Sequence, residues 1–339
     1  MTDPDTTAPS SASPAPSATP DLSATPDLSA TPAPAPEVSV VTPIYERPDL
    51  VAELLATLAA QTLTDWELVL VDDASTADIA AALDAAPGGR DPRVRLIRQE
   101  RNGGPAAARN AGIEAARGRF VAFLDSDDAW APDKLMRQRD ALLALPDPDR
   151  SLATCATEVT YAGGRVQVRP ERGPAPGERP AAFLYVANMF AQCSAFFLGG
   201  ALLREGGLRF ETRLRQYEDH LFYIAAASAA TDVVHLPEVL SMWRNDDRPG
   251  RMGASDDIAK GRAFLAIARE AGLMDQTEAL AFELRCLAPE LLARDRLAAL
   301  RLAARGARVR ALPREAWAKV LLAGAIGPAR YARLREARR

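Results

Sequence analysis

Between Val38 and Leu124, short and predominantly apolar runs alternate with segments of helical periodicity, and this alternation constrains the fold more than any other feature. The apolar runs are Val38–Thr42, Trp66–Val71, Val94–Ile97 and Phe120–Leu124. Such runs are typical of strands buried on both faces, and strands that alternate with helices over short connections predict a parallel sheet covered by helices. Ligands bind to these sheets beyond the carboxyl ends of the strands.

The segments between and after these runs carry weaker patterns. We expect an amphipathic helix from Pro48 onward and a second helix between Asn102 and Ala116. Further along the chain, the predicted elements are strands at Leu152–Tyr161, Gln192–Leu198 and Val233–Leu236 and a helix at Leu221–Ala230. From about residue 257 onward, Ala, Leu and Arg dominate, which predicts a series of helices interrupted by prolines.

Changes in composition predict three regions. Residues 1–36 hold nine of the 26 prolines and a tandem six-residue repeat (Ser17–Pro32) with almost no large apolar side chain, so we expect a disordered tail rich in Pro, Ala, Ser and Thr. Residues 37–256 are expected to form one α/β domain, and residues 257–339 a basic helical region.

Composition also excludes several classes of protein. Three widely spaced cysteines and two histidines support neither a disulfide framework nor a zinc cluster, which fits a reducing cytosol. The longest uncharged run, Ala181–Leu203, is broken by polar residues and is not expected to span a membrane, and the acidic, Pro-rich start is not a secretory signal. The net charge of −4 excludes a generally basic nucleic-acid binder, although residues 291–339 carry 13 Lys and Arg against three acidic side chains.

A cluster of three carboxylates follows the fourth apolar run, at Asp125, Asp127 and Asp128. Because a strand has a period of two, Asp125 and Asp127 are expected to project to the same side. Hard oxygen ligands of this kind suit Mg²⁺ or Mn²⁺, which commonly bridge substrate phosphates. The alternative, with about equal weight, is a loop whose aspartates cap the helix expected after Pro132.

Two further strand ends carry polar groups that suit a nucleotide. Tyr45, after the first run, could stack on a base, and Asp73, after the second run, could accept a hydrogen bond from a base N–H. A half-buried loop aromatic and a turn carboxylate are the alternatives. The segment Asn102–Asn110 lacks the common phosphate-loop patterns, and an ion pair is at least as good an interpretation of Arg109 as a ligand contact.

Five motifs, VSVVTPIYER, ELVLVDDAS, NGGPAAARNAG, RFVAFLDSDDAWAPDKL and QYEDHLF, resemble in order and spacing those of glycosyltransferase family 2, whose members have the GT-A fold. The resemblance covers Val38 to Trp243. It implies a GT-A type, mostly parallel nucleotide-binding sheet flanked by helices, with a nucleotide-sugar-binding half at 37–130 and an acceptor-binding half at 131–256. The helical C-terminal extension and the disordered N-terminal tail complete this fold class.

The resemblance also implies roles for individual residues. Asp73 would accept from the base, Asp125 would face the ribose, and Asp127 with Asp128 would hold Mn²⁺ or Mg²⁺ on the diphosphate. Asp219 would act as the general base that removes the proton of the acceptor hydroxyl, while the alternative for Asp219 is a carboxylate that stabilises a helix end. Arg244, or Arg248 or Arg251 in the loop that follows, would reach the diphosphate. The full set implied for the nucleotide sugar is Thr42, Pro43, Tyr45, Arg47, Asp73, Gly104, Arg109, Asp125, Ser126, Asp127, Glu218 and Arg244.

The function implied is a metal-dependent, inverting transfer of a single sugar from a nucleotide-sugar donor, a UDP-sugar, to a hydroxyl acceptor in cell-surface polysaccharide or glycolipid assembly. The chain lacks the QxxRW run of processive synthases. One alternative is a nucleotidyltransferase, although Pro43–Arg47 stands where its Gly-rich, Lys- or Arg-bearing loop is expected; a catalytically silent nucleotide- or sugar-binding module is the other.

The expected partners are a nucleotide-sugar donor and a saccharide or lipid-linked acceptor, and no nucleic acid. The expected location is the cytoplasm, with peripheral contact on the inner face of the cell membrane. The segment Trp317–Ile326, with basic residues alongside, suits an interfacial helix, and a helical lid over the sheet is an equally weighted alternative.

Overall fold

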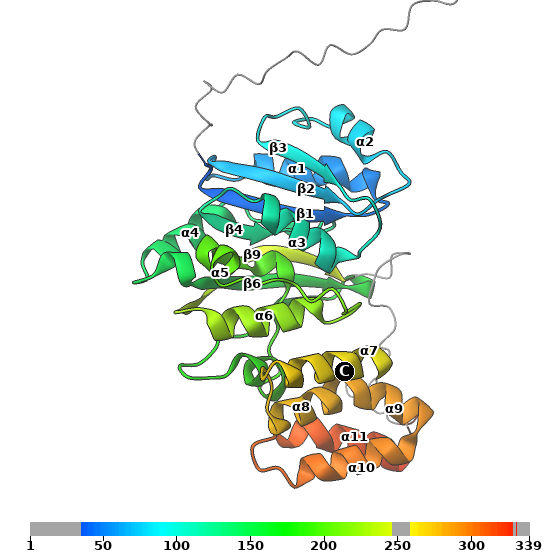
Figure 1. Ribbon diagram of the computed structural model, residues 1–339. Helices are drawn as coiled ribbons and strands as arrows, with labels where there is room; N and C mark the ends of the chain where they lie inside the picture. Colours follow the sequence, from blue (N-terminus) through cyan, green and yellow to red (C-terminus); the bar gives the residue numbers. More distant parts are fainter. Residues whose placement is uncertain (1–34, 246–257, 328–329, 331–339) are drawn as a thin grey trace, which may run out of the picture. The chain divides into compact units, whose positions relative to one another are not determined.

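The structure, a computed structural model, describes residues 35–245, 258–327 and 330 (Figure 1). The tail expected at residues 1–36 lies outside this part of the chain except for its last two residues, and so do Arg248 and Arg251. The expected boundary at residues 256 and 257 also lies outside it, so the division into regions stays a prediction.

The first four strands lie side by side in parallel, in the order β3-β2-β1-β4, as the alternating pattern predicts. They are β1 (Val38–Ile44), β2 (Trp66–Asp72), β3 (Val94–Arg98) and β4 (Phe120–Phe123). The connecting helices are α1 (Val51–Ala59), α2 (Ile79–Ala85) and α3 (Pro105–Ala115). Each expected strand and helix of this half is therefore present, with ends that differ by a few residues.

Helices cover both faces of this parallel half. Val40 of β1 belongs to the same buried cluster as Leu54 of α1, whereas the next residue, Val41, lies against α3 on the opposite face. A Cβ at Gly112 of α3 would lie 2.2 Å from the Val41 side chain, so only glycine permits this close approach of helix and strand. The strand period of two thus divides β1 between two cores.

The second half of the sheet is mixed. β8 (Phe197–Gly199) pairs antiparallel with β4 and with β6 (Leu152–Tyr161), and β6 pairs parallel with β9 (Val233–Asn245). The short β5 (Ala129–Trp130) borders β9, and β7 (Val166–Arg169) pairs with β6 outside the main order, which gives nine strands in the described residues. The α/β fold class is confirmed.

Two elements of this half differ from expectation. The strand predicted at Gln192–Leu198 starts instead with a helical turn at Cys193–Ala195, and only Phe197–Gly199 joins the sheet. The short extended segment predicted at Val233–Leu236 is the beginning of β9, whose full length is 13 residues. Its pairing with β6 skips Pro237 and Glu238 in a bulge, so a proline that ends most strand patterns does not end this one.

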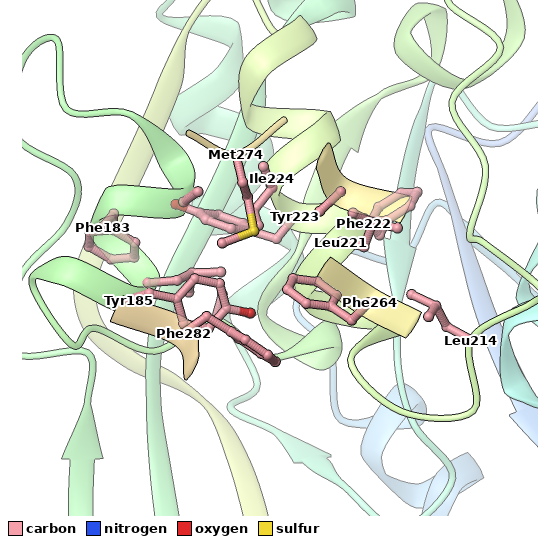
Figure 2. Packing of buried hydrophobic residues seen from close by; sticks show 14 of the residues in the cluster. Phe183, Tyr185, Leu214, Leu221, Phe222, Tyr223, Ile224, Phe264, Met274 and Phe282 are labelled. Carbon is pink, nitrogen blue, oxygen red and sulfur yellow. The ribbon is translucent and has the colours of Figure 1, made fainter. Parts of the chain in front are cut away.

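Further helices complete the structure: α4 (Lys134–Leu143), α5 (Gly200–Arg204), α6 (Glu218–Ala229), α7 (Ile258–Glu270), α8 (Gln276–Phe282), α9 (Ala288–Arg294), α10 (Arg296–Ala307) and α11 (Arg314–Ile326). The C-terminal helices share a hydrophobic core with the sheet domain. Figure 2 shows Phe264 of α7 and Phe282 of α8 together with Tyr185 and the buried side of α6. The Phe264 and Phe282 rings are 4.7 Å apart between centroids, and Tyr185 lies 5.0 Å from Phe282. In the part of the chain that the structure describes, no helix combines the length and the apolar character needed to cross a bilayer.

Candidate active site

Asp73 follows β2 and joins it to the start of α3. Its carboxylate accepts hydrogen bonds from the backbone N–H groups of Gly103 (2.8 Å) and Gly104 (2.7 Å), and its own N–H donates to the Ile44 carbonyl at the end of β1. Burial raises the pKa of Asp73 above its ordinary value, while the two N–H donors and Arg215 oppose that shift. Asp73 therefore holds together the carboxyl ends of β1 and β2 and the N-terminus of α3.

The loop after β1 is tied to the loop after β2 by a residue that the sequence pattern did not single out. Glu46, with φ 54°, accepts hydrogen bonds from the backbone N–H groups of Thr76 and Ala77 and from the Thr76 hydroxyl. This arrangement leaves Tyr45 at the edge of the sheet with 48% of its surface exposed. The exposed ring agrees with a stacking role as well as with a loop aromatic.

Other predicted residues of this loop are placed differently. Pro43 lies within β1 and is half-buried, and Arg47 forms an ion pair of 2.9 Å with Asp49. Thr42 is fully buried, and its hydroxyl oxygen has no hydrogen-bond partner in the described part of the chain. A buried, unpaired hydroxyl at a strand end is available to a ligand that approaches this edge.

The carboxylate cluster lies on a reverse turn and not on a strand. β4 ends at Phe123, and the N–H of Asp128 donates to the carbonyl of Asp125 at 3.0 Å. The strand geometry from which Asp125 and Asp127 were expected to project to one side is therefore absent, because the period of two does not extend past the end of the ladder. Ser126 and Asp127 occupy the middle of the turn and are half-buried.

Arg109 of α3 connects this turn with α6. Its Nη2 donates to Asp125 at 2.6 Å, and its Nη1 lies 3.4 Å from Glu218. The residue is 4% exposed, and its guanidinium lies 5.2 Å from the centroid of the Phe210 ring. Arg109 therefore forms an ion pair within the protein, which is one of the two interpretations that the sequence offers for it. The pair brings together Asp125 and Glu218, which are far apart in the sequence.

Asp128 turns out to be a buried side chain. Ser194 donates to its Oδ2 at 2.6 Å, the Gln192 amide donates to the same oxygen, and Oδ1 is buried without a hydrogen bond in the described residues. Burial and the neighbouring carboxylates raise the pKa of Asp128 well above its ordinary value. A metal contact of Asp128 stays a prediction, because Oδ2 already accepts two hydrogen bonds while the buried Oδ1 has none among the described residues.

The Ser194 hydroxyl supports the carboxylate turn at two points. Besides donating to Asp128, it accepts a hydrogen bond from the Asp125 N–H at 2.9 Å, and its carbonyl accepts from the Trp130 ring N–H at 2.8 Å. Neither Ser194 nor Gln192 was predicted. They belong to a largely apolar stretch in which no motif marks them as functional, so only the tertiary structure reveals their role.

The start of α6 presents Glu218 and Asp219. The preceding Tyr217 has a left-handed backbone (φ 66°), which ends the loop and sets both carboxylates in the first turn of the helix. Burial, followed by the charge of Asp219, raises the pKa of Glu218. His220 is hydrogen-bonded to the Tyr185 hydroxyl at 2.8 Å, which agrees with a packing role for this histidine.

Two polar contacts hold the loop before α6 against α3. The Asn110 amide donates to the Phe210 carbonyl (2.9 Å) and accepts from the Phe210 N–H (2.8 Å), and Arg215 donates to the Gly103 carbonyl at 3.5 Å. Gly104, with φ 83°, lies next to the Arg215 guanidinium. Arg215 was not predicted from the sequence. Its basic side chain directly before the QYEDHLF motif is the signal that could have identified it.

Arg244 contacts a residue of α1. Its Nη2 forms an ion pair of 2.7 Å with Glu53 of α1, and both side chains are about half exposed (47% and 48%). A contact between Arg244 and a diphosphate therefore stays a prediction.

A continuous series of contacts connects Asp73, Asp125 and Glu218. Asp73 binds the loop at Gly103 and Gly104, Arg215 binds the same loop, and the helix that starts beside Arg215 carries Glu218. Glu218 and Asp125 then share Arg109. The acidic groups from the second strand, the fourth strand and α6 thus lie along one edge of the sheet, at its carboxyl ends, where α/β proteins bind ligands.

This sheet order, with carboxylates at the ends of β2 and β4 and at the start of α6, defines the GT-A class of fold. Two solved structures agree. TarS from S. aureus in complex with UDP-GlcNAc has a TM-score of 0.59 and 22% identity, covering 84% of this chain and 83% of that one. The mannosyltransferase PcManGT from Pyrobaculum calidifontis, in complex with GDP-Man and Mn²⁺, has a TM-score of 0.51 and 21% identity, covering 87% of each chain.

Residues 39–199 match the family described as glycosyl transferase family 2, and this segment of the chain belongs to that family. A curated relative is the succinoglycan biosynthesis protein ExoO of Rhizobium meliloti, which is 47% identical over 102 residues, covering 30% of this chain and 28% of that protein. The chain spans 23% to 42% of the length of three curated relatives that it matches.

Proposed function

We propose that this protein is a glycosyltransferase that moves one sugar from a nucleotide-sugar donor, a UDP-sugar, to a hydroxyl acceptor with inversion at the anomeric carbon. The observation that carries the proposal is Arg109, which joins the turn of Asp125 to the first turn of α6. This link brings the donor-side carboxylates and the candidate base to the same edge of the sheet. The UDP-GlcNAc and GDP-Man in the two similar structures support a nucleotide sugar as the donor.

The nucleoside would bind at the ends of β1 and β2. The exposed Tyr45 ring offers a face for stacking, and the buried Thr42 hydroxyl offers a hydrogen bond. Asp73 already accepts two backbone N–H groups, but a carboxylate has about four acceptor positions, so it can also accept from a base N–H. Asp125, fixed by Arg109, would face the ribose.

Asp219 is the proposed general base. A sugar hydroxyl is a poor nucleophile, and a carboxylate within hydrogen-bond distance can remove its proton as the oxygen attacks the anomeric carbon. The half-buried Asp219 stands in the first turn of α6, next to Glu218, which Arg109 holds in place. Arg109 therefore positions the helix that carries the base.

The side chains fit a divalent cation that also binds the donor. Among the described residues, no three His, Cys, Asp or Glu side chains form a cluster that could hold an ion by themselves. Asp127, in the middle of the turn, would supply a protein oxygen and the diphosphate would supply others, as is usual for Mg²⁺ and Mn²⁺. When bound, the ion neutralises charge on the leaving nucleoside diphosphate.

The proposed setting is the cytoplasmic side of the cell membrane, in assembly of a surface polysaccharide or glycolipid, with a saccharide or lipid-linked acceptor. ExoO, a succinoglycan biosynthesis protein by name, supports a polysaccharide. Peripheral membrane contact through the basic C-terminal helices belongs to this proposal, and binding of nucleic acid does not.

The principal test is the Asp219→Asn substitution, which keeps the size of the side chain and removes the base. We expect loss of sugar transfer of at least 100-fold, since general-base catalysis typically contributes 10²–10⁴-fold. Nucleoside diphosphate release from a panel of nucleotide sugars measures the activity, and calorimetry with UDP should show unchanged binding. Normal turnover by the variant would refute this assignment of the base, and release of pyrophosphate from a nucleoside triphosphate would indicate nucleotidyl transfer instead.

A matched pair of substitutions tests the metal. Asp127→Asn should abolish the Mn²⁺-dependent part of UDP binding, whereas Asp128→Asn should preserve it because Asp128 is buried against Gln192 and Ser194. Calorimetry with UDP, with and without Mn²⁺, separates the two variants. If Asp128→Asn loses metal-dependent binding and Asp127→Asn keeps it, the proposed ligand is wrong.

A further inference from the structure

A cavity of about 250 Å³ lies among the C-terminal helices, away from the carboxylate edge of the sheet. Its walls come from α7, α9, α10 and the helical turn Glu283–Leu287, which joins α8 to α9 (Figure 1). We call this cavity the arginine groove. Its floor includes Leu287 and Leu302, which are 4% and 7% exposed.

The arginine groove carries more positive charge than its own carboxylate balances. Arg262 of α7 and Arg301 and Arg305 of α10 line it, together with Glu283. Glu283 lies 3.9 Å from Arg305, too far for a hydrogen bond. Within the part of the chain that the structure describes, Arg262 and Arg301 have no carboxylate partner, so the groove holds three cations against one anion.

The basic and apolar walls are arranged along one helix face. Arg301, Leu302 and Arg305 are spaced so that all three side chains face the groove from α10. Leu297 precedes Arg301 by one turn of the same helix and is 56% exposed. A ligand that fits this surface therefore needs a negative group for the guanidinium groups and an apolar group for the leucines.

We propose that the arginine groove binds the phosphate headgroup of an anionic lipid and so holds the protein at a membrane surface. Guanidinium groups form paired hydrogen bonds with phosphate oxygens, and the leucines would cover the first methylene groups of the lipid chain. The volume of about 250 Å³ is below the range of about 300–1,000 Å³ for sites that enclose a whole small molecule. It suits a headgroup whose chains stay in the bilayer.

This inference deepens the proposed membrane contact but does not depend on sugar transfer. It differs from an interfacial helix at α11, because the lipid contact is assigned to α7, α10 and the leucine floor. The two locations can be separated experimentally, since α11 carries its own exposed basic residues, Arg314 and Lys319, which do not line the groove.

The test is flotation of the full chain with vesicles of phosphatidylcholine alone or mixed with phosphatidylglycerol. We expect binding only to the mixed vesicles and a loss of about 30-fold in the double variant Arg301→Ala/Arg305→Ala, because each basic residue near an anionic surface contributes about a factor of five. The matched control, Arg314→Ala/Lys319→Ala, removes the same charge from α11 and should change binding by less than about threefold. UDP binding by calorimetry should be unchanged in both variants, which separates this inference from the proposed function.

Three outcomes would overturn the inference. Equal losses in the two double variants would show a general basic surface, and an unchanged Arg301→Ala/Arg305→Ala variant would show that the groove is not used. Heat released on titration with inorganic phosphate and abolished in that variant, without vesicle binding, would indicate a site for free phosphate.

Discussion

Arginines occur in two contrasting settings in this protein. Arg109 is almost completely buried between Asp125 and Glu218, and every charge it meets comes from the chain itself. In the arginine groove, Arg262 and Arg301 are exposed and meet no carboxylate among the described residues. A buried, paired arginine fixes the geometry of a site, whereas exposed, unpaired arginines leave their charge to an external anion.

The contrast assigns different experimental consequences to the same residue type. Removal of Arg109 leaves two carboxylates without their cation in a largely dry environment. Removal of groove arginines relieves like-charge repulsion and breaks only the distant contact of Arg305 with Glu283 among the described residues. The free energy of unfolding of variants at Arg109 and in the arginine groove therefore tests whether the buried and the exposed arginines differ in this way.

The largest effect is expected for Arg109→Ala. Breaking a buried ion pair by removing one partner typically lowers the free energy of unfolding by about 3–5 kcal/mol. Urea denaturation followed by circular dichroism measures the change. Arg109→Lys is the control, because it keeps the charge but not the two-pronged geometry, and it should lose less stability. A loss below about 1 kcal/mol for Arg109→Ala would contradict the role given to the buried pair.

A smaller effect is expected in the pH dependence of stability. The pKa of Glu218 is raised above its ordinary value of 4.5 because the carboxyl is buried beside Asp219. At pH values above 4.5, the folded chain therefore binds more protons at Glu218 than the unfolded chain does. The free energy of unfolding then falls as the pH rises toward the raised pKa. Glu218→Gln should flatten this part of the profile, measured as the free energy of unfolding from about pH 4 upward. An identical slope in the variant would show that Glu218 does not contribute.

The smallest effect is expected for Arg301→Ala/Arg305→Ala. Both side chains are exposed and Arg305 has only the distant Glu283, so the free energy of unfolding should change by no more than about 0.5 kcal/mol. The same urea titration measures it. A loss as large as that of Arg109→Ala would erase the distinction between the two settings.

The sequence pattern predicts the first half of the fold well, because its information is local. Each strand of residues 38–124 is a continuous apolar run, and a parallel sheet requires the ends of such strands to meet at one edge. Asp73 and Asp125 were placed at that edge from this rule together with family resemblance. Their arrangement in the structure agrees with it.

The rest depends on contacts between residues far apart in the chain, which periodicity does not encode. Asp128 looks like its neighbour Asp127, and only Ser194 and Gln192, more than 60 positions later, show that it is buried. The length of β9 follows from its pairing with β6 across the bulge at Pro237. A local pattern could not reveal either feature.

The loop that precedes α6 is anchored at both ends to the same helix, by Asn110 to Phe210 and by Arg109 to Glu218. Between these anchors, Leu214 is buried and Arg215 contacts Gly103, so the exposed Thr212 and Arg213 are the positions that can change in side chain without disturbing either contact. Over evolutionary time, such a tethered stretch can vary at these exposed positions while the carboxylates beside it keep their geometry.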